Sequence, residues 1–339
     1  MQHVFVFVQL CNVLNPHLAV ALSSASNELR TATQALLPQL RTDHEAAAAL
    51  CLKLGMRSCK ELREAKSVDW RGKRRDNNDL TADDLALLGT LGSVLPALQG
   101  LILLEPATGP DGVQRLAAGL GAGALLVVTN VRLYGMHVGD AGASALAAAL
   151  GRGALPRLES LCLFGAAITD AGLVALAPAL RRLTALEYVD LSYNPLGDEG
   201  LAALLAPPPP PAGAPPPPAG APPPTTGVLT KLKTLRLSHT QVTDTGCATL
   251  AAAIGSGTLP ALEKLSLEGI PASATAIAAV HEARNQERLK AEAAAVKAKE
   301  LRDTQGANKR KAAVVKFVLC CASPLVWFVS CFRYQCSAI

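Results

Sequence analysis

A unit of mostly 28 to 30 residues recurs along the chain, and this recurrence constrains the fold more than any other feature. Each copy has a short Leu/Val pattern, a turn, and an Ala/Leu-rich run. The short pattern occurs as seven triplets, which begin at Val68, Leu101, Val131, Leu161, Val189, Leu235 and Leu265. Tandem units of this size pack against their neighbours, so the sequence predicts a stacked repeat array.

The outer two residues of every triplet are apolar, whereas the middle residue varies. Because side chains along a strand alternate between faces, the outer residues are expected to face a core and the middle ones an open side. The Ala/Leu-rich runs place apolar residues at i and i+4, which is typical of a helix with one buried face. The sequence therefore predicts an α/β solenoid with a curved parallel sheet inside and helices outside.

Four of the helical runs begin with an Asp that is followed two residues later by a Gly. These residues are Asp140, Asp170, Asp198 and Asp244, with Gly142, Gly172, Gly200 and Gly246. A carboxylate at a helix start can accept bonds from unpaired backbone N–H groups, so we expect each Asp to cap its own helix, a contribution of about 1 kcal/mol. Glycine is unfavourable inside a helix, so its recurrence predicts close approach between neighbouring helices. In the first repeat, Thr81 and Asp84 have the spacing of a capping box.

The full unit reads L-x-x-L-x-L-x-x-N-x-[IL]-x-[DT]-x-G-x-x-x-L-A-x-A-L. Over residues 68–277 it resembles the ribonuclease-inhibitor-like class of leucine-rich repeats, which implies a curved array of about seven units. The family's Asn after the strand is present only as Asn194. The equivalent positions carry Pro106, Met136, Ala166, Thr240 and Ile270. Because that Asn bonds the backbone of the turn, we expect turns that are less regular than in the family.

Residues 1–66 precede the repeats and are expected to form a helical N-terminal cap, with a helix over residues 46–63. A second interpretation is that residues 1–30 form a degenerate F-box-like segment, although the Leu-Pro pair usual at its start is absent. The apolar opening has no Lys or Arg before it and is interrupted by polar residues, which argues against a signal peptide.

Two other segments depart from the repeat pattern. Residues 207–226 form a Pro-rich run, which we interpret as a surface loop within the solenoid of residues 67–277. The run at Pro207–Pro224 is either a tolerated insertion or a docking site for a proline-binding module. Residues 278–312 are expected to form a charged, solvated helix. Residues 313–339 form an apolar tail rich in Cys, in which Phe317–Phe332 either attaches to a membrane or folds back on the protein.

Several classes of function are disfavoured by what the sequence contains. It has no recognisable catalytic set, phosphate loop or metal-ligand spacing, so we predict no enzyme activity, no cofactor and no metal site. Aromatic residues make up only 4% of the chain and its net charge is +5 with the excess near the C-terminus, which argues against nucleic-acid binding by the repeats. Nine Cys residues without framework spacing favour a reducing, cytoplasmic location.

What remains is a surface on the open side of the strands. The residues expected there are Asp69, Arg71, Ile102, Leu104, Arg132, Tyr134, Cys162, Phe164, Tyr188, Asp190, Thr234, Arg236, Lys264 and Glu268. Tyr134, Phe164 and Tyr188 are interpreted as apolar anchors for a protein partner on this concave face. Arg132, Asp190 and Arg236 would set charge and register, and Lys264 is a further candidate for protein binding on the same face.

The sequence thus predicts a non-enzymatic scaffold that binds another protein. One alternative is a substrate-receptor subunit of a ubiquitin ligase, in which the F-box-like segment of residues 1–30 would dock onto the ligase. A second alternative is a regulator of a small GTPase. The basic C-terminal region disfavours the second alternative, because activators of nuclear-transport GTPases with this repeat type carry an acidic one.

Overall fold

The computed structural model describes residues 37–70, 80–104, 111–206 and 229–321. It divides into two units, residues 1–284 and 285–339, which are treated separately. The F-box-like segment (1–30), the Pro-rich run (207–226) and the apolar tail beyond Cys321 fall outside the described residues. Within the described residues, no helix combines the length and apolar character needed to cross a membrane.

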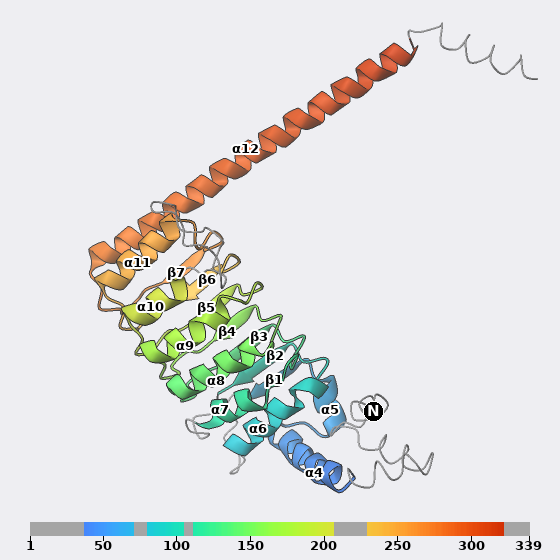
Figure 1. Cartoon of the computed structure of the whole chain (residues 1–339), viewed down its shortest axis with the longest axis vertical. Coiled ribbons are helices and arrows are strands. Elements are labelled where there is room, and N and C mark those ends of the chain that lie inside the picture. Colours follow the sequence, from blue (N-terminus) through green and yellow to red (C-terminus); the bar gives the residue numbers. More distant parts are fainter. Residues whose placement is uncertain (1–36, 71–79, 105–110, 207–228, 322–339) are drawn as a thin grey trace, which may run out of the picture. The chain divides into compact units, whose positions relative to one another are not determined.

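The described part of the first unit contains seven strands in one parallel sheet, in the order in which they occur in the chain (Figure 1). They are β1 (Ser67–Trp70), β2 (Gly100–Leu103), β3 (Asn130–Leu133), β4 (Ser160–Cys162), β5 (Tyr188–Asp190), β6 (Thr234–Arg236) and β7 (Lys264–Ser266). The register places the middle residues of all seven triplets side by side. The strands predicted from the triplets are therefore confirmed, and the sheet continues from β5 to β6 across the Pro-rich insertion.

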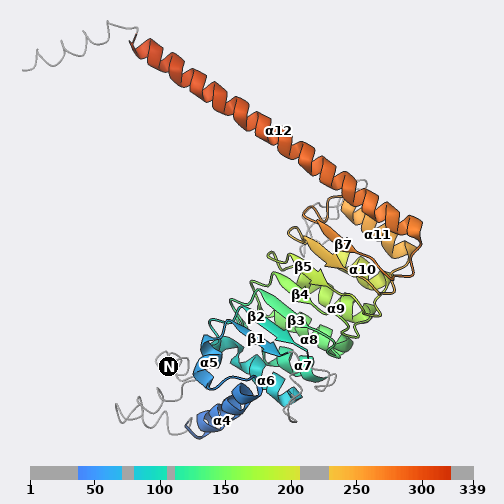
Figure 2. The same cartoon turned by 180° about the vertical axis from the view of Figure 1, so that it is seen from behind.

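Helices connect successive strands and lie along one side of the sheet (Figures 1 and 2). They are α6 (Ala82–Leu91), α7 (Asp111–Gly119), α8 (Gly139–Gly151), α9 (Asp170–Leu180), α10 (Asp198–Leu205) and α11 (Asp244–Gly255), with a short 3-10 helix η1 (Gly92–Val94) after α6. The predicted α/β solenoid is thus the observed fold. We call the other side of the sheet, which is the predicted concave face, the open face.

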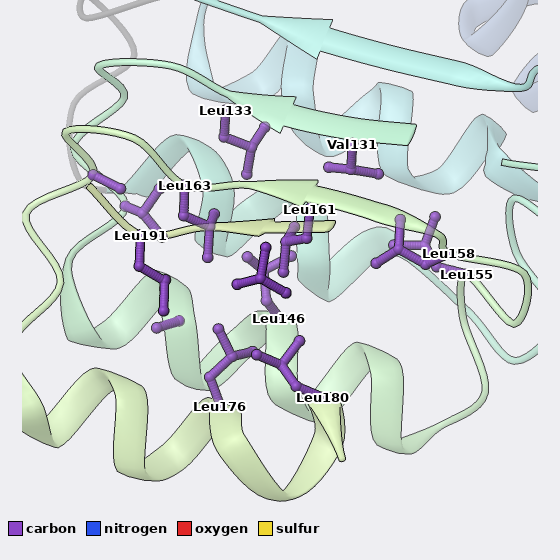
Figure 3. Close-up of a cluster of buried hydrophobic side chains, with 14 of the residues drawn as sticks. Val131, Leu133, Leu146, Leu155, Leu158, Leu161, Leu163, Leu176, Leu180 and Leu191 are labelled. Atoms are coloured by element: carbon purple, nitrogen blue, oxygen red, sulfur yellow. The ribbon is translucent and has the colours of Figure 1, made fainter. Parts of the chain in front are cut away.

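The core lies between the sheet and the helices and runs through every repeat. In Figure 3, Leu161 and Leu163 of the fourth repeat lie among Leu146 of α8 and Leu176 of α9, and all four are buried. Burying one such side chain contributes about 1.5–3 kcal/mol. Because each repeat shares its core with both neighbours, no single unit is expected to be stable alone.

Within the described residues, α4 (Leu37–Lys53) and α5 (Cys59–Glu64) precede the first strand. The single helix expected over residues 46–63 is wrong, because Gly55 adopts a left-handed φ of +76° and Ser58 then caps a new helix. Leu50 and Leu62 are buried in the same core as the repeats. These helices therefore cover the apolar end of the first repeat.

A polar contact joins α4 to the first repeat. Lys53 Nζ lies 2.5 Å from Asp84 Oδ2, and Asp84 also forms the predicted capping box with Thr81. Burial alone would raise the pKa of Asp84, but the hydrogen bonds from Lys53 and Thr81 outweigh it and lower the pKa below its usual value. The start of α6 is thereby tied to the end of α4.

The recurring Asp residues do not cap their own helices, which corrects the sequence prediction. In α9 and α11 the cap is the preceding Thr169 or Thr243, whose hydroxyl accepts from a backbone N–H. The Asp carboxylate instead reaches the next repeat: Asp140 Oδ1 accepts from Thr169 N at 2.8 Å, and Asp198 Oδ1 accepts from Thr243 N at 2.8 Å. The physical reason is that the Asp comes after the cap position, as the first residue of α9, α10 and α11 and the second of α8, so its carboxylate is placed to bond the backbone of the next repeat.

The same link recurs at the other two Asp residues. Asp170 Oδ1 accepts from Gly197 N at 2.7 Å and Gly200 N at 2.8 Å, and Asp244 Oδ1 accepts from Ser273 N at 2.6 Å. Hydrogen bonds to a charged group contribute about 1.5–3 kcal/mol each. A chain of carboxylates therefore connects the starts of successive helices.

Three of the four recurring glycines make room for these carboxylates, whereas Gly142 faces Val138 and Val113. A Cβ placed on Gly172 would overlap Asp140 Oδ1, and one on Gly246 would overlap Asp198 Oδ1. At Gly200 the Cβ would lie 2.7 Å from Asp170 Oδ1. The close approach predicted from the glycines is therefore between a helix and the Asp of the previous repeat.

Helix α12 (Ala274–Cys321) follows the last strand. Its residues up to Arg284 belong to the first unit, where Val280 is buried against the last repeat. In the second unit the side chains of Leu289, Val296 and Leu301 are exposed. Pairs three or four residues apart, such as Arg288 with Glu292, contribute little at such exposed positions.

Candidate functional site

Four rings from four neighbouring repeats contact one another in sequence on the open face. Ring centroids are 6.4 Å apart between Tyr134 and Phe164, and 4.7 Å apart between Phe164 and Tyr193. Tyr193 and His239 are stacked, with centroids 4.3 Å apart and planes 29° apart. We call Tyr134, Phe164, Tyr193 and His239 the aromatic row. Tilted and offset contacts of this kind contribute about 0.5–1.5 kcal/mol each beyond burial.

Two members of the row occupy a strained backbone position. In the turn after each of five strands, the residue two positions beyond the strand triplet has a left-handed φ. These residues are Gly135 (+57°), Gly165 (+60°), Tyr193 (+60°), His239 (+55°) and Gly269 (+67°). A residue with a side chain loses about 1–2 kcal/mol in this conformation relative to an ordinary one, whereas glycine does not. The fifth and sixth repeats therefore carry rings where glycine would be more favourable for the backbone.

The strained turns are held by hydrogen bonds to the next repeat. Tyr193 N donates to Ser238 O at 2.9 Å, and His239 N donates to Glu268 O at 2.7 Å. The His239 ring lies against Gly269, where any Cβ would overlap it. The positions of both rings are thus fixed by the backbone as well as by stacking.

A second group lies on β5 and β6, and we call Tyr188, Asp190 and Arg236 the Tyr188 cluster. Tyr188 Oη donates to Asp190 Oδ2 at 3.0 Å, and Arg236 Nη1 lies 3.7 Å from the same oxygen. The Arg236 guanidinium also lies over the Tyr188 ring, 5.6 Å from its centroid. Burial raises the pKa of the Tyr188 hydroxyl, and the Asp190 carboxylate raises it further. The carboxylate of this cluster is therefore already compensated.

The predicted anchors are not all brought together. Tyr134 and Phe164 are in contact and half-buried, as neighbouring positions on the open face require. Tyr188 belongs instead to its own cluster, because it precedes the strand triplet whereas Tyr134 and Phe164 follow theirs.

Two residues expected to be open are buried. Cys162 is 1% exposed and Asp190 is 4% exposed, although both lie on the open face. The larger side chains beside them provide the cover. Burial raises the pKa of the Cys162 thiol, and the nearby Asp190 carboxylate adds to the effect. Neither residue offers surface to a partner.

The remaining candidates are charged residues at the two ends of the aromatic row. Arg132 on β3 donates from Nε to Asn130 Oδ1 at 3.1 Å, and its Nη1 lies 3.4 Å from Tyr134 Oη. Lys264 and Glu268 are exposed at opposite ends of β7. Arg71 falls outside the described residues.

Sequence reasoning missed Tyr193 and His239. Both follow the open-face position by one residue and were assigned to the turn. An alignment of the repeats could have found Tyr193 and His239, because they occupy the position at which other repeats have Gly135, Gly165 and Gly269. Aromatic residues are unusual where glycine recurs.

Comparison with known families agrees with this geometry. Residues 155–177, 183–205 and 228–251 match the family described as Leucine Rich repeat. The chain is a leucine-rich-repeat solenoid. No curated protein matches the sequence of this leucine-rich-repeat protein.

Two solved structures are similar to it at low sequence identity. One is TLR13 in a complex with ssRNA13, at 16% identity, with 65% of this chain and 35% of that chain covered and a TM-score of 0.31. The other is the internalin InlF from Listeria monocytogenes, at 13% identity, with 69% and 92% covered and a TM-score of 0.23. This chain thus spans about a third of the TLR13 chain.

Proposed function

We propose that this leucine-rich-repeat protein is a non-enzymatic scaffold that binds another protein on its open face, with the aromatic row at the centre of the contact. The observation that carries the proposal is the row itself. Only 4% of the residues are aromatic, yet four rings contact one another on adjacent repeats, and two of them occupy backbone positions that favour glycine. Aromatic side chains at the centre of a patch usually dominate binding energy.

The residues around the row would define the limits of this surface. Phe164 and Tyr193 would provide the apolar centre, since Tyr193 is 52% exposed, stacks on His239 and makes a tilted contact with Phe164. The Tyr188 cluster would form a polar rim on β5 and β6, with Arg236 half-exposed above the buried Asp190. A polar rim around an apolar centre is the usual arrangement of a protein interface.

Two finer assignments belong to the same proposal. We infer that the repeats are of the ribonuclease-inhibitor-like class, because an α-helix of eight or more residues follows each strand from β3 to β6. We also infer a reducing, cytoplasmic location, which is supported by the four free, buried thiols of the described residues: Cys51, Cys59, Cys162 and Cys247.

Replacing Phe164 with alanine is expected to reduce recovery of the main partner at least tenfold when the tagged full-length chain is purified from cells. Truncation removes the ring that joins Tyr134 to Tyr193 in the row. The matched control is Val174→Ala, which removes an exposed side chain from α9 in the same repeat but on the helix side. If folded Phe164→Ala recovers as much partner as the unmodified chain, or if only Val174→Ala loses the partner, the interface lies elsewhere.

A further inference from the structure

We propose that the aromatic row binds an extended peptide of a partner protein, with an acidic residue at the β3 end and a basic residue at the β7 end. Apolar or aromatic side chains would lie between them on Phe164 and Tyr193. This inference rests on the proposed function and adds to it the chemistry, length and direction of the bound segment.

The β3 end of the row carries an uncompensated cation. Arg132 contacts two neutral oxygens, Asn130 Oδ1 and Tyr134 Oη, and it has no ion pair within the described part of the chain. Arg236, on β6, differs because it is paired with Asp190. The contact with Tyr134 Oη also brings the Arg132 guanidinium to the first ring of the row. A carboxylate on the partner would therefore find its counter-charge at this end.

The β7 end carries an uncompensated anion. Glu268 follows β7, is exposed, and has no ion pair among the residues that the structure describes. Its backbone carbonyl accepts from His239 N at 2.7 Å, so its position is fixed relative to the last ring of the row. Lys264 does not neutralise this end, because it lies four residues earlier, about 13 Å back along the strand. A Lys or Arg on the partner would complement Glu268.

The separation of the two ends sets the length of the peptide. From β3 to β7 the sheet takes four strand-to-strand steps, which is about 19 Å at about 4.8 Å per step. An extended chain rises about 3.3 Å per residue, so about six residues cover this distance. Alternate side chains of such a segment would point toward the rings, which lie 4.3–6.4 Å apart.

The left-handed turns support a binding role for the rings rather than a packing role. Glycine occupies the same turn position at Gly135, Gly165 and Gly269, so the fold does not require a side chain there. Tyr193 and His239 introduce strain, and Tyr193 remains half-exposed despite its stacking. Strained residues of this kind concentrate at functional sites.

The test is a selection of displayed random heptapeptides against the purified full-length chain, followed by fluorescence anisotropy with the best synthetic peptide. We expect enriched peptides to have Asp or Glu near one end, Lys or Arg near the other, and Leu, Phe, Tyr or Trp between them. Arg132→Glu should weaken binding about tenfold, and a peptide with its acid replaced by Lys should recover the loss. Arg182→Glu, at an exposed position on the helix side, should leave binding unchanged.

A second variant separates the peptide inference from the general one. Tyr193→Gly should weaken peptide binding about tenfold, with little change in the midpoint of thermal unfolding, because relief of backbone strain offsets the lost stacking. Peptides that depend on Tyr193 but show no charge preference, or are Pro-rich, would overturn the inference and leave the proposed function standing. Peptides whose affinity is unchanged by Tyr193→Gly, or a selection that enriches no peptide, would also overturn the peptide inference. In that case the Phe164→Ala experiment would decide whether the proposed function stands.

Discussion

Replacing Gly172 with alanine is expected to lower the free energy of unfolding by about 3 kcal/mol. The new Cβ would overlap Asp140 Oδ1 and would lie 3.0 Å from Ile168 Cγ2 and 3.1 Å from Asp140 Cα. The carboxylate of Asp140 would then have to leave the Thr169 N–H and hydroxyl, from which it accepts at 2.8 and 2.6 Å. The substitution thus combines overpacking with the loss of the link between two repeats.

Urea unfolding followed by circular dichroism measures this effect, and Gly151→Ala is its control. Gly151 ends α8, and a Cβ there would meet no atom within 4 Å. Because alanine favours a helix over glycine by about 1 kcal/mol, this control should be neutral or slightly stabilising. Gly172→Ala should add little to Asp140→Ala in a double-mutant cycle. If Gly172→Ala is as harmless as Gly151→Ala, the carboxylate chain does not hold the repeats together.

Replacing Asn194 with alanine is expected to lower the free energy of unfolding by about 4 kcal/mol. The side-chain amide of Asn194 is buried and donates to Leu163 O at 2.7 Å and Leu191 O at 2.9 Å. Its Oδ1 accepts from Ala166 N and Ile168 N, both at 3.0 Å. Truncation would leave these four backbone groups, from two repeats, without their partner in a dry turn.

The equivalent residue of the next repeat provides the comparison. Thr240 is also buried, but its hydroxyl donates to Leu237 O at 2.7 Å and has no other hydrogen bond among the described residues. Thr240→Ala should therefore cost about 1 kcal/mol in the same urea titration. Equal losses for Asn194→Ala and Thr240→Ala would show that the turn is held by its backbone rather than by the amide.

The strands were predictable because their signal is local. In a triplet such as Val131–Leu133, the alternation of apolar and variable residues identifies the buried side of the strand. The repeat interval then identifies the strand that pairs with it. The partner of each Asp was not predictable from local rules. Asp140 lies where a helix cap is expected, but its carboxylate accepts a hydrogen bond from Thr169, 29 residues later. This partner depends on the distance between stacked helices, which the local sequence does not give.

The candidate site was predictable in part. Tyr134 and Phe164 each come directly after their Leu/Val triplet, so their contact follows from the repeat. Tyr193 and His239 were not predicted, since the open face was inferred from alternation along the strands and both residues lie beyond the strand in the turn. Asp190 is buried because the larger side chains of Tyr188 and Arg236 contact it. The alternation of side chains along a strand predicts which face a residue lies on, but not whether its neighbours cover it.

Site-specific photo-crosslinking in cells tests most directly whether the open face is the binding surface. A benzoylphenylalanine would replace Tyr193 on the open face or Val174 on the helix side, both of which are exposed. The account predicts a discrete crosslinked partner from position 193, which disappears when Phe164 is also replaced by alanine, and none from position 174. Crosslinks from position 174 alone, or an adduct at 193 that is indifferent to Phe164→Ala, would contradict it.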